Sequence, residues 1–226
     1  MTTHAYLKDN VMKSRNSTLI LFTMLLLGTA AFLGGCATTG MDRHVKTVNS
    51  IQVVDSEIRK IIVQIDATSA SLDSLVKAGK FDLKNAFETY SDNIVKLDNE
   101  GQLVLKRVEE MKSRSKEYFS EWEQQGNSYT NPQIRELSEE RRIKLAETYA
   151  QVPEAGAGIK EAYLSYLADL KEIQRYLAND LTPERVESIA PVAKKAVLEF
   201  VALKASLKPV ILALDDIKAE LNGGMK

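Results

Sequence analysis

Residues 83–122 read LKNAFETYSDNIVKLDNEGQLVLKRVEEMKSRSKEYFSEW. Alternating steps of four and three residues select twelve positions in this stretch: Leu83, Phe87, Tyr90, Ile94, Leu97, Gly101, Val104, Val108, Met111, Ser115, Tyr118 and Trp122. All of them except Gly101 and Ser115 are large and apolar or aromatic. Such a 3.5-residue repeat over more than five heptads is typical of a long helix with one narrow buried face. At about 1.5 Å per residue the helix is roughly 60 Å long, so it needs partners of similar length.

A first helix is expected from about Asp42 to Ala78. Its repeat places nine residues at core positions: Val48, Ile51, Asp55, Ile58, Ile62, Ile65, Ser69, Leu72 and Val76. Because a buried carboxylate is costly unless paired, Asp55 is expected to meet a lysine or arginine or to rotate outward. Gly79 is expected to end this helix in the left-handed conformation, and Asp82 to cap the next one.

Asn131-Pro132 is a start signal for a third helix, since asparagine caps a first turn and proline suits the first helical position. Pro153 removes a backbone donor, and Gly156 and Gly158 weaken the helix after it, so we expect a kink or short break there. The core repeat then resumes at six positions: Ile159, Tyr163, Tyr166, Leu170, Ile173 and Leu177.

Thr182-Pro183 repeats the start signal for a last helix, which Asn222-Gly223-Gly224 ends. No polar residue interrupts its core repeat: Val186, Ile189, Ala193, Ala196, Phe200, Leu203, Leu207, Val210, Leu214, Ile217 and Leu221. Pro191 and Pro209 fall between these positions, so they bend the helix without emptying its core.

The composition fits a single helical domain. The chain has 226 residues, five prolines and a net charge of −1, which gives no basic surface for nucleic acid. Short loops between long helices favour antiparallel neighbours. The sequence therefore predicts an all-α fold: an elongated antiparallel coiled-coil-like bundle of about four long helices over residues 42–226, with the third helix kinked near Pro153.

The segments of residues 1–35 follow one another in the order that is typical of a bacterial lipoprotein signal peptide. Basic residues precede an apolar run from Leu19 to Leu33, and Gly34-Gly35-Cys36 resembles the lipobox, after which the cysteine is acylated. Two or more acyl chains, palmitate among them, anchor a protein stably where one chain is marginal. Residues 36–41 then form a lipidated tether. A plain membrane anchor with an incidental cysteine is the alternative, and either Met1 or Met12 is the true start.

Similarity to Gram-negative lipoproteins implies a location beyond the inner membrane. Ala37, a residue other than aspartate, follows the cysteine, which in those proteins permits transfer to the outer membrane. We therefore expect an outer-membrane lipoprotein that faces the periplasm.

Two groups of residues are candidate sites. The first is a candidate ligand or interface patch of aromatic side chains: Tyr118, Phe119, Trp122, Tyr163 and Tyr166. Tyrosine and tryptophan can bury the ring while their O–H or N–H group faces water. The patch is therefore either a binding surface or an aromatic plug that closes the bundle. The second, Arg135, Ser138 and Arg141, shares one helical face and is either an anion or partner contact or part of an ion-pair network.

The residues that carry a family resemblance are scattered along the helices: Tyr90-Ser91, Met111, Tyr118-Phe119, Trp122, Asn131, Arg135, Ser138 and Arg141. With them the chain resembles an uncharacterised group of bacterial lipoproteins, domain-of-unknown-function family 2959. The likeness covers most of the mature chain. It implies a helical cell-envelope lipoprotein and supplies no activity, ligand or functional residue.

An enzyme is not expected, because His44 is the only histidine after the signal peptide and neither a di-metal motif nor a phosphate loop is found. No metal and no cofactor is expected beyond the lipid on Cys36. We expect a non-enzymatic scaffold or adaptor that holds to the membrane by its lipid, meets a protein partner in the envelope and binds no nucleic acid. The alternative is a binding module for a small apolar or lipid-like ligand between the helices. A peptidoglycan link through Lys226 is a third hypothesis, and the oligomeric state is open.

Overall fold

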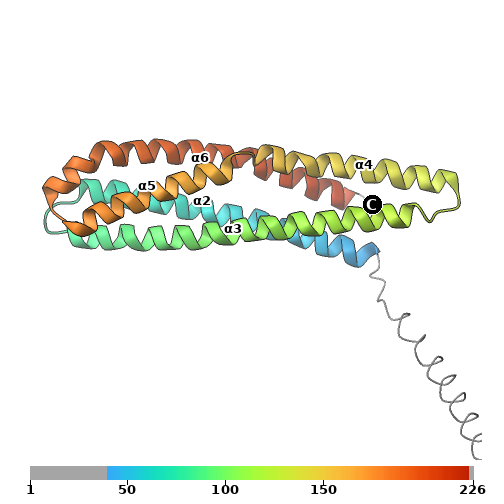
Figure 1. Cartoon of the computed structure of the whole chain (residues 1–226), viewed down its shortest axis with the longest axis horizontal. Helices are drawn as coiled ribbons and strands as arrows, with labels where there is room; N and C mark the ends of the chain where they lie inside the picture. The colour runs from blue at the N-terminus through green and yellow to red at the C-terminus, as the bar shows by residue number, and fades with distance from the viewer. Residues whose placement is uncertain (1–39, 224–226) are drawn as a thin grey trace, which may run out of the picture. The chain divides into compact units, whose positions relative to one another are not determined.

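The computed structural model describes residues 40–223, which fold into α-helices joined by short turns, with no strand in this region (Figure 1). The helices are α2 (Gly40–Lys77), α3 (Leu83–Gly126), α4 (Pro132–Ala155), α5 (Ile159–Asn179) and α6 (Pro183–Gly223). The signal peptide, Cys36 and Lys226 lie outside the described residues. The predicted all-α bundle is confirmed.

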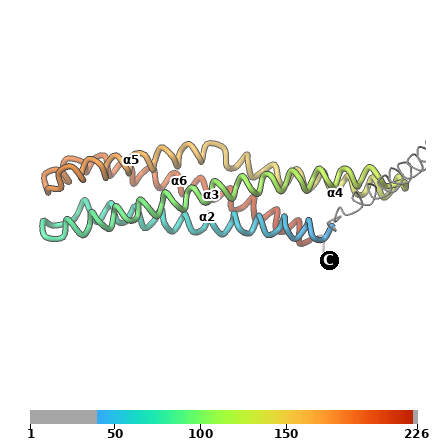
Figure 2. The backbone as a smooth tube through the Cα atoms, turned by 60° about the horizontal axis from the view of Figure 1, so that its bottom comes forward, coloured from blue at the N-terminus to red at the C-terminus, as the bar shows by residue number. Residues whose placement is uncertain are grey.

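The helices form a four-membered antiparallel bundle in which α4 and α5 follow one another and together make the third member (Figures 1 and 2). Helix α2 packs against α3 and α6, and the α4–α5 pair packs against the same two helices from the other side. Helix α2 begins and α6 ends at one end of the bundle, beyond which the α3–α4 hairpin extends, while the α2–α3 and α5–α6 turns lie at the other end (Figure 1). The 44 residues of α3 span about 66 Å.

The start signal of α4 acts as expected. The Asn131 side chain accepts hydrogen bonds from the backbone N–H groups of Gln133 and Ile134, at 2.9 and 3.4 Å, and Pro132 is the first helical residue. These bonds satisfy donors that a helix start otherwise leaves without a partner.

The break in the third member is also confirmed. Pro153 lies in the last turn of α4, and the helix stops at Ala155. Gly158, with φ of 76°, then takes the left-handed conformation as α5 begins, and it is the one residue at positive φ in the described region. The expectation that Gly79 takes this conformation is therefore wrong. Helix α2 ends at Lys77, and a tight turn follows in which the Asp82 N–H donates to the Gly79 carbonyl.

The core positions expected on α3 are all buried or half-buried, and those on α6 are buried except for the half-buried Phe200. On α2 four of the nine predicted core positions are wrong by one residue, namely Val48, Asp55, Ile62 and Val76, whereas Ser69 is buried as predicted. The buried repeat there is Thr47, Ile51, Val54, Ile58, Ile61, Ile65, Thr68, Leu72 and Leu75. Asp55 and Ile62 lie beside it and are half-buried. Both registers offer apolar residues, but the observed one keeps the Asp55 carboxylate out of the core, where its desolvation is costly.

Two buried tyrosines join α3 to α5 through backbone carbonyls. The Tyr163 hydroxyl donates to the Leu97 carbonyl at 2.8 Å, and the Tyr90 hydroxyl donates to the Leu170 carbonyl at 2.9 Å. The hydroxyls of Tyr90 and Tyr163 thus each have an acceptor, which offsets the cost of their burial. The Tyr163 ring also fills the space beside Gly101, where an added Cβ would lie 1.8 Å from the hydroxyl oxygen. The close approach at Gly101 is therefore that of a neighbouring side chain.

The buried core of the described region lies between Ile51 and Leu221, entirely within the helical unit of residues 40–226. A fragment of residues 40–226 therefore contains every core residue of the described region.

Because of the contact between Tyr163 and Gly101, we expect alanine at position 101 to destabilise the helix instead of stabilising it. Alanine normally stabilises a helix by about 1 kcal/mol relative to glycine. Gly101→Ala should instead lower the free energy of unfolding by about 1–3 kcal/mol, because Tyr163 must move. In a Tyr163→Ala background the same change should stabilise the fragment. Gly79→Ala is the control, since no atom lies within 4 Å of its added Cβ. Urea unfolding of the wild type and of these four variants measures the free energies. A Gly101→Ala cost that persists without the Tyr163 ring would contradict this packing.

Candidate functional site

The predicted aromatic patch is divided in the structure. Tyr118, Phe119 and Trp122 gather near the end of α3, with edge-to-face ring centroids 5.4 and 5.5 Å from that of Tyr118. Phe119 also meets Tyr149 of α4, at 5.2 Å between centroids. These three rings are half-buried and Tyr149 is buried, an arrangement that closes the space between α3 and α4.

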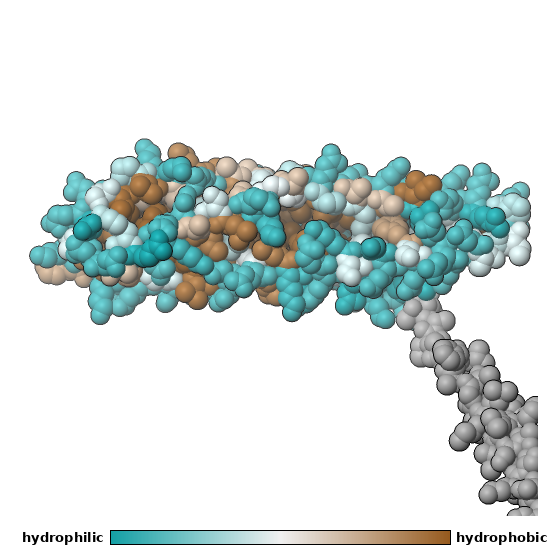
Figure 3. All heavy atoms as spheres, viewed as in Figure 1, coloured by the Kyte–Doolittle hydropathy of each residue, from teal (hydrophilic) through white to brown (hydrophobic). Residues whose placement is uncertain are grey.

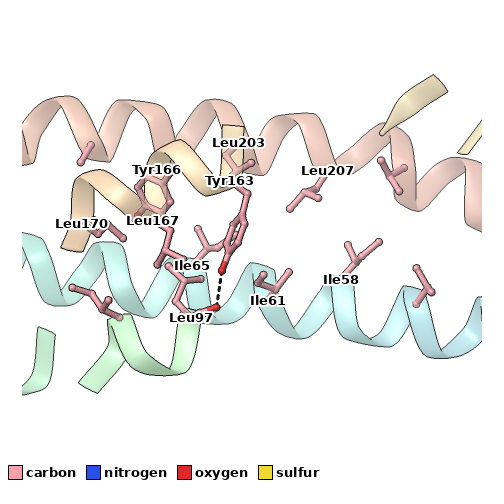
Figure 4. Packing of buried hydrophobic residues seen from close by; sticks show 14 of the residues in the cluster. Ile58, Ile61, Ile65, Leu97, Tyr163, Tyr166, Leu167, Leu170, Leu203 and Leu207 are labelled. Atoms are coloured by element: carbon pink, nitrogen blue, oxygen red, sulfur yellow. Dashed lines mark hydrogen bonds between the residues drawn. The ribbon is translucent and has the colours of Figure 1, made fainter. Parts of the chain in front are cut away.

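Tyr163 and Tyr166 lie elsewhere, in the buried face of α5 near the middle of the bundle (Figure 4). Burial raises the pKa of both phenols well above its ordinary value, so both stay neutral. The five aromatic residues therefore do not form one surface.

Arg135, Ser138 and Arg141 each have a partner within the chain. Arg135 donates to the Tyr129 carbonyl at 2.7 Å, and the Trp122 indole N–H donates to the Ser138 hydroxyl at 2.9 Å. Arg141 donates to the Glu220 carboxylate and, at 2.6 Å, to its carbonyl. Hydrogen bonds from Arg141 and Lys144 lower the pKa of the Glu220 carboxyl. Arg141 therefore belongs to an ion-pair network that joins α4 to α6, whereas Arg135 and Ser138 make hydrogen bonds to uncharged groups.

A second charged cluster joins α2 to α6. The Asp55 carboxylate accepts from Lys218 and from Arg59, each at 3.0 Å, and Arg59 also lies 3.7 Å from Asp215. Burial raises the pKa of the Asp55 carboxyl, but the two hydrogen bonds outweigh it, and the pKa lies below its ordinary value. Asp55 thus has both a lysine and an arginine partner, Lys218 and Arg59, where the sequence led us to expect one of the two.

An apolar cavity of 360 Å³ lies where α4 gives way to α5. Figure 4 shows Leu203 and Leu207 of α6 facing Ile58 and Ile61 of α2 across this part of the core, with the Tyr163 ring beside them. The cavity wall on α3 consists of Gly101, Val104, Leu105, Val108 and Met111. Apolar residues show on the surface of the bundle near its middle in Figure 3. Sequence reasoning did not find this cavity, although the glycines at 156 and 158 were its signal.

Exposed apolar side chains mark both ends of the bundle. In the α2–α3 turn Phe81 is 97% exposed. At the opposite end, Ile134 and Leu137 of α4 are exposed on the hairpin that extends past the other helices. Phe81 lies outside the helical repeats, so its exposure has no sequence signal. Ile134 and Leu137 are spaced as core residues of a helix would be and are exposed all the same.

Two kinds of site are missing from residues 40–223. No three His, Cys, Asp or Glu side chains there are arranged to hold a metal ion. No helix in this range combines the length and the apolar character that a membrane crossing requires.

Comparison with known proteins gave one match. The model of the family described as "Protein of unknown function (DUF2959)" matches residues 36–217. Curated proteins and solved structures gave no match.

The Asp55 cluster predicts a pH-dependent stability. Because the pKa of Asp55 is lowered on folding, its stabilisation is complete above the unfolded pKa of about 3.9 and is lost as the pH falls through the folded value. Asp55→Asn should therefore cost about 1–2 kcal/mol at pH 7, and this cost should shrink below pH ~4. Asp73→Asn, which removes an exposed pair with Lys77, is the control and should change stability by less than about 0.5 kcal/mol. Urea unfolding between pH 7 and pH 3 measures both, and a constant Asp55→Asn cost would contradict the assignment.

Proposed function

The chain belongs to the family of proteins of unknown function DUF2959. From its N-terminal sequence and its helical fold we propose that it is a lipid-anchored protein of the bacterial cell envelope. In this proposal it has no enzymatic activity and acts as a helical scaffold or adaptor that holds a partner at a set distance from the membrane. The anchor is the acylated Cys36, on the periplasmic side of the outer membrane.

The position of Phe81 carries the proposal. Its side chain is 97% exposed in the turn between α2 and α3, at the end of the bundle opposite the start of α2. An aromatic side chain buries about 150–250 Å² when covered, and such residues dominate the binding energy of protein interfaces. Phe81 contributes nothing to the bundle core, so binding is the use that its exposure supports.

The covalent chain supports a long reach for this residue. Three residues separate Cys36 from Gly40, so an acylated Cys36 would keep the start of α2 within about 14 Å of the lipid. The 38 residues of α2 then span about 57 Å to the turn that holds Phe81. A rigid bundle of this length would present Phe81 far from the anchor, which is what a spacer or adaptor needs.

Photocrosslinking tests the partner surface. With p-benzoylphenylalanine in place of Phe81, irradiation of intact cells should join the chain to an envelope protein. The same photoreactive residue at Val63, which is 67% exposed on the side of α2, should give at least fivefold less of that product. Equal yields at the two positions, or no product at position 81, would contradict a partner surface at this end. Phe81→Ala should compete poorly for the partner while changing stability by less than about 0.5 kcal/mol, since Phe81 is outside the core.

Metabolic labelling tests the anchor. Radioactive palmitate should label the wild-type chain, whereas Cys36→Ser should remain unlabelled and accumulate with residues 1–35 still attached, because the acylated thiol directs cleavage. Thr38→Ser is the matched control and should be labelled normally. A wild-type chain without label would contradict the lipoprotein assignment and favour the plain apolar anchor.

A further inference from the structure

The apolar cavity arises because the third member of the bundle is interrupted. Between Val152 and Tyr163 no side chain of the α4–α5 junction is buried. Opposite this gap, α2 and α6 keep their apolar repeats, with Ile58, Ile61 and Leu207 all buried. Three apolar helix faces therefore meet a junction of small residues, and a cavity remains where a fourth row of side chains would lie.

The dimensions of the cavity suit one narrow ligand. Its wall on α2 runs from Val54 to Ile65, and its wall on α3 from Gly101 to Lys112, each about 16 Å along the axis. A volume of 360 Å³ spread over that length describes an elongated cavity rather than a round one. An extended hydrocarbon chain matches this shape better than a compact ligand does. A cavity of about 150 Å³ holds a benzene molecule, so this one holds roughly a dozen carbons.

The chemistry of the wall also favours a hydrocarbon. Tyr163 supplies the one hydroxyl of the lining, and that hydroxyl already donates to the Leu97 carbonyl. An apolar cavity of this kind is a poor site for water, and its wall atoms lack contacts until an apolar ligand fills it. Charged residues of both signs lie at the edge of the lining: Glu109, Lys112, Lys160 and Glu161. A polar head can remain among them in water while its chain enters the bundle.

We propose that this cavity binds a single unbranched hydrocarbon chain of about twelve carbons, carried by a fatty acid or by a single-chain lysolipid. The site is independent of the surface at Phe81. Its ligand enters at the α4–α5 junction, between α3 and the exposed residues Pro153 and Ala157.

Calorimetric titration of the fragment of residues 40–226 tests the proposal. The probes are fatty acids of 8, 10, 12, 14 and 16 carbons below their critical micelle concentrations, with 1-lauroyl-lysophosphatidylglycerol to separate the two sources of the chain. Binding should saturate at one ligand per chain, and affinity should rise about fourfold per methylene up to about 12 carbons and then level off. Binding of the fatty acid alone assigns the site to free fatty acids, and comparable binding of the lysolipid extends it to lysolipids.

Matched phenylalanine variants on α3 locate the site. Val108 lines the cavity, whereas Val95 is 57% exposed on the same helix and away from it. Val108→Phe should fill the cavity and weaken dodecanoic acid binding at least tenfold, with a melting temperature equal to or above that of the wild type. Val95→Phe should bind as the wild type does. Val104→Phe, also in the wall, serves if Val108→Phe does not fold.

A dodecanoic acid with a diazirine on its chain completes the test. Irradiation should place the adducts on the α3 wall or the α4–α5 junction, and Val108→Phe should abolish them. No saturable binding by any chain, unchanged binding by the folded wall variants, or adducts confined to the ends of the bundle would each overturn the proposal.

Discussion

The close contact between the Tyr163 ring and Gly101 sets the position of the third member of the bundle against α3. The ring occupies the space of an absent side chain, and its hydroxyl donates to the Leu97 carbonyl at 2.8 Å. Sliding α5 along α3 would drive this ring into a larger side chain and leave a buried hydroxyl without an acceptor, which costs about 1–3 kcal/mol. The bond from Tyr90 to the Leu170 carbonyl repeats the constraint seven residues away on each helix.

The same register continues across the break. The bond from Trp122 to Ser138 lies on α3 and α4, 25 residues from Leu97 on one helix and 25 residues from Tyr163 along the other member. The residues Gly156–Gly158 therefore interrupt the helix without shifting its alignment against α3. This is why the break leaves a cavity rather than a misaligned bundle: the helices on both sides keep their places, and the side chains between them are missing.

Charge pairs at the edges support this arrangement and restrict which surfaces are open. Arg141 and Lys144 hold Glu220 near the end of α6, and Lys218 holds Asp55 on α2. Side chains used in this way are poorly placed to bind an external anion. The surfaces proposed for binding are therefore apolar ones, namely the exposed Phe81 and the cavity at the α4–α5 junction.

The sequence by itself determined the all-α class, the number of long helices, the start of α4 at Pro132 and the break after Pro153, because periodicity, caps and helix breakers act within a few residues of one another. It could not decide between two adjacent registers on α2, since both contain apolar residues, and only packing against α3 and α6 showed that Asp55 lies outside the core. Nor could it show that Tyr163 and Tyr118 lie in different parts of the bundle, or that the cavity exists. Those features depend on which residues of different helices lie opposite one another, and that alignment is set by contacts between residues more than sixty positions apart in the chain.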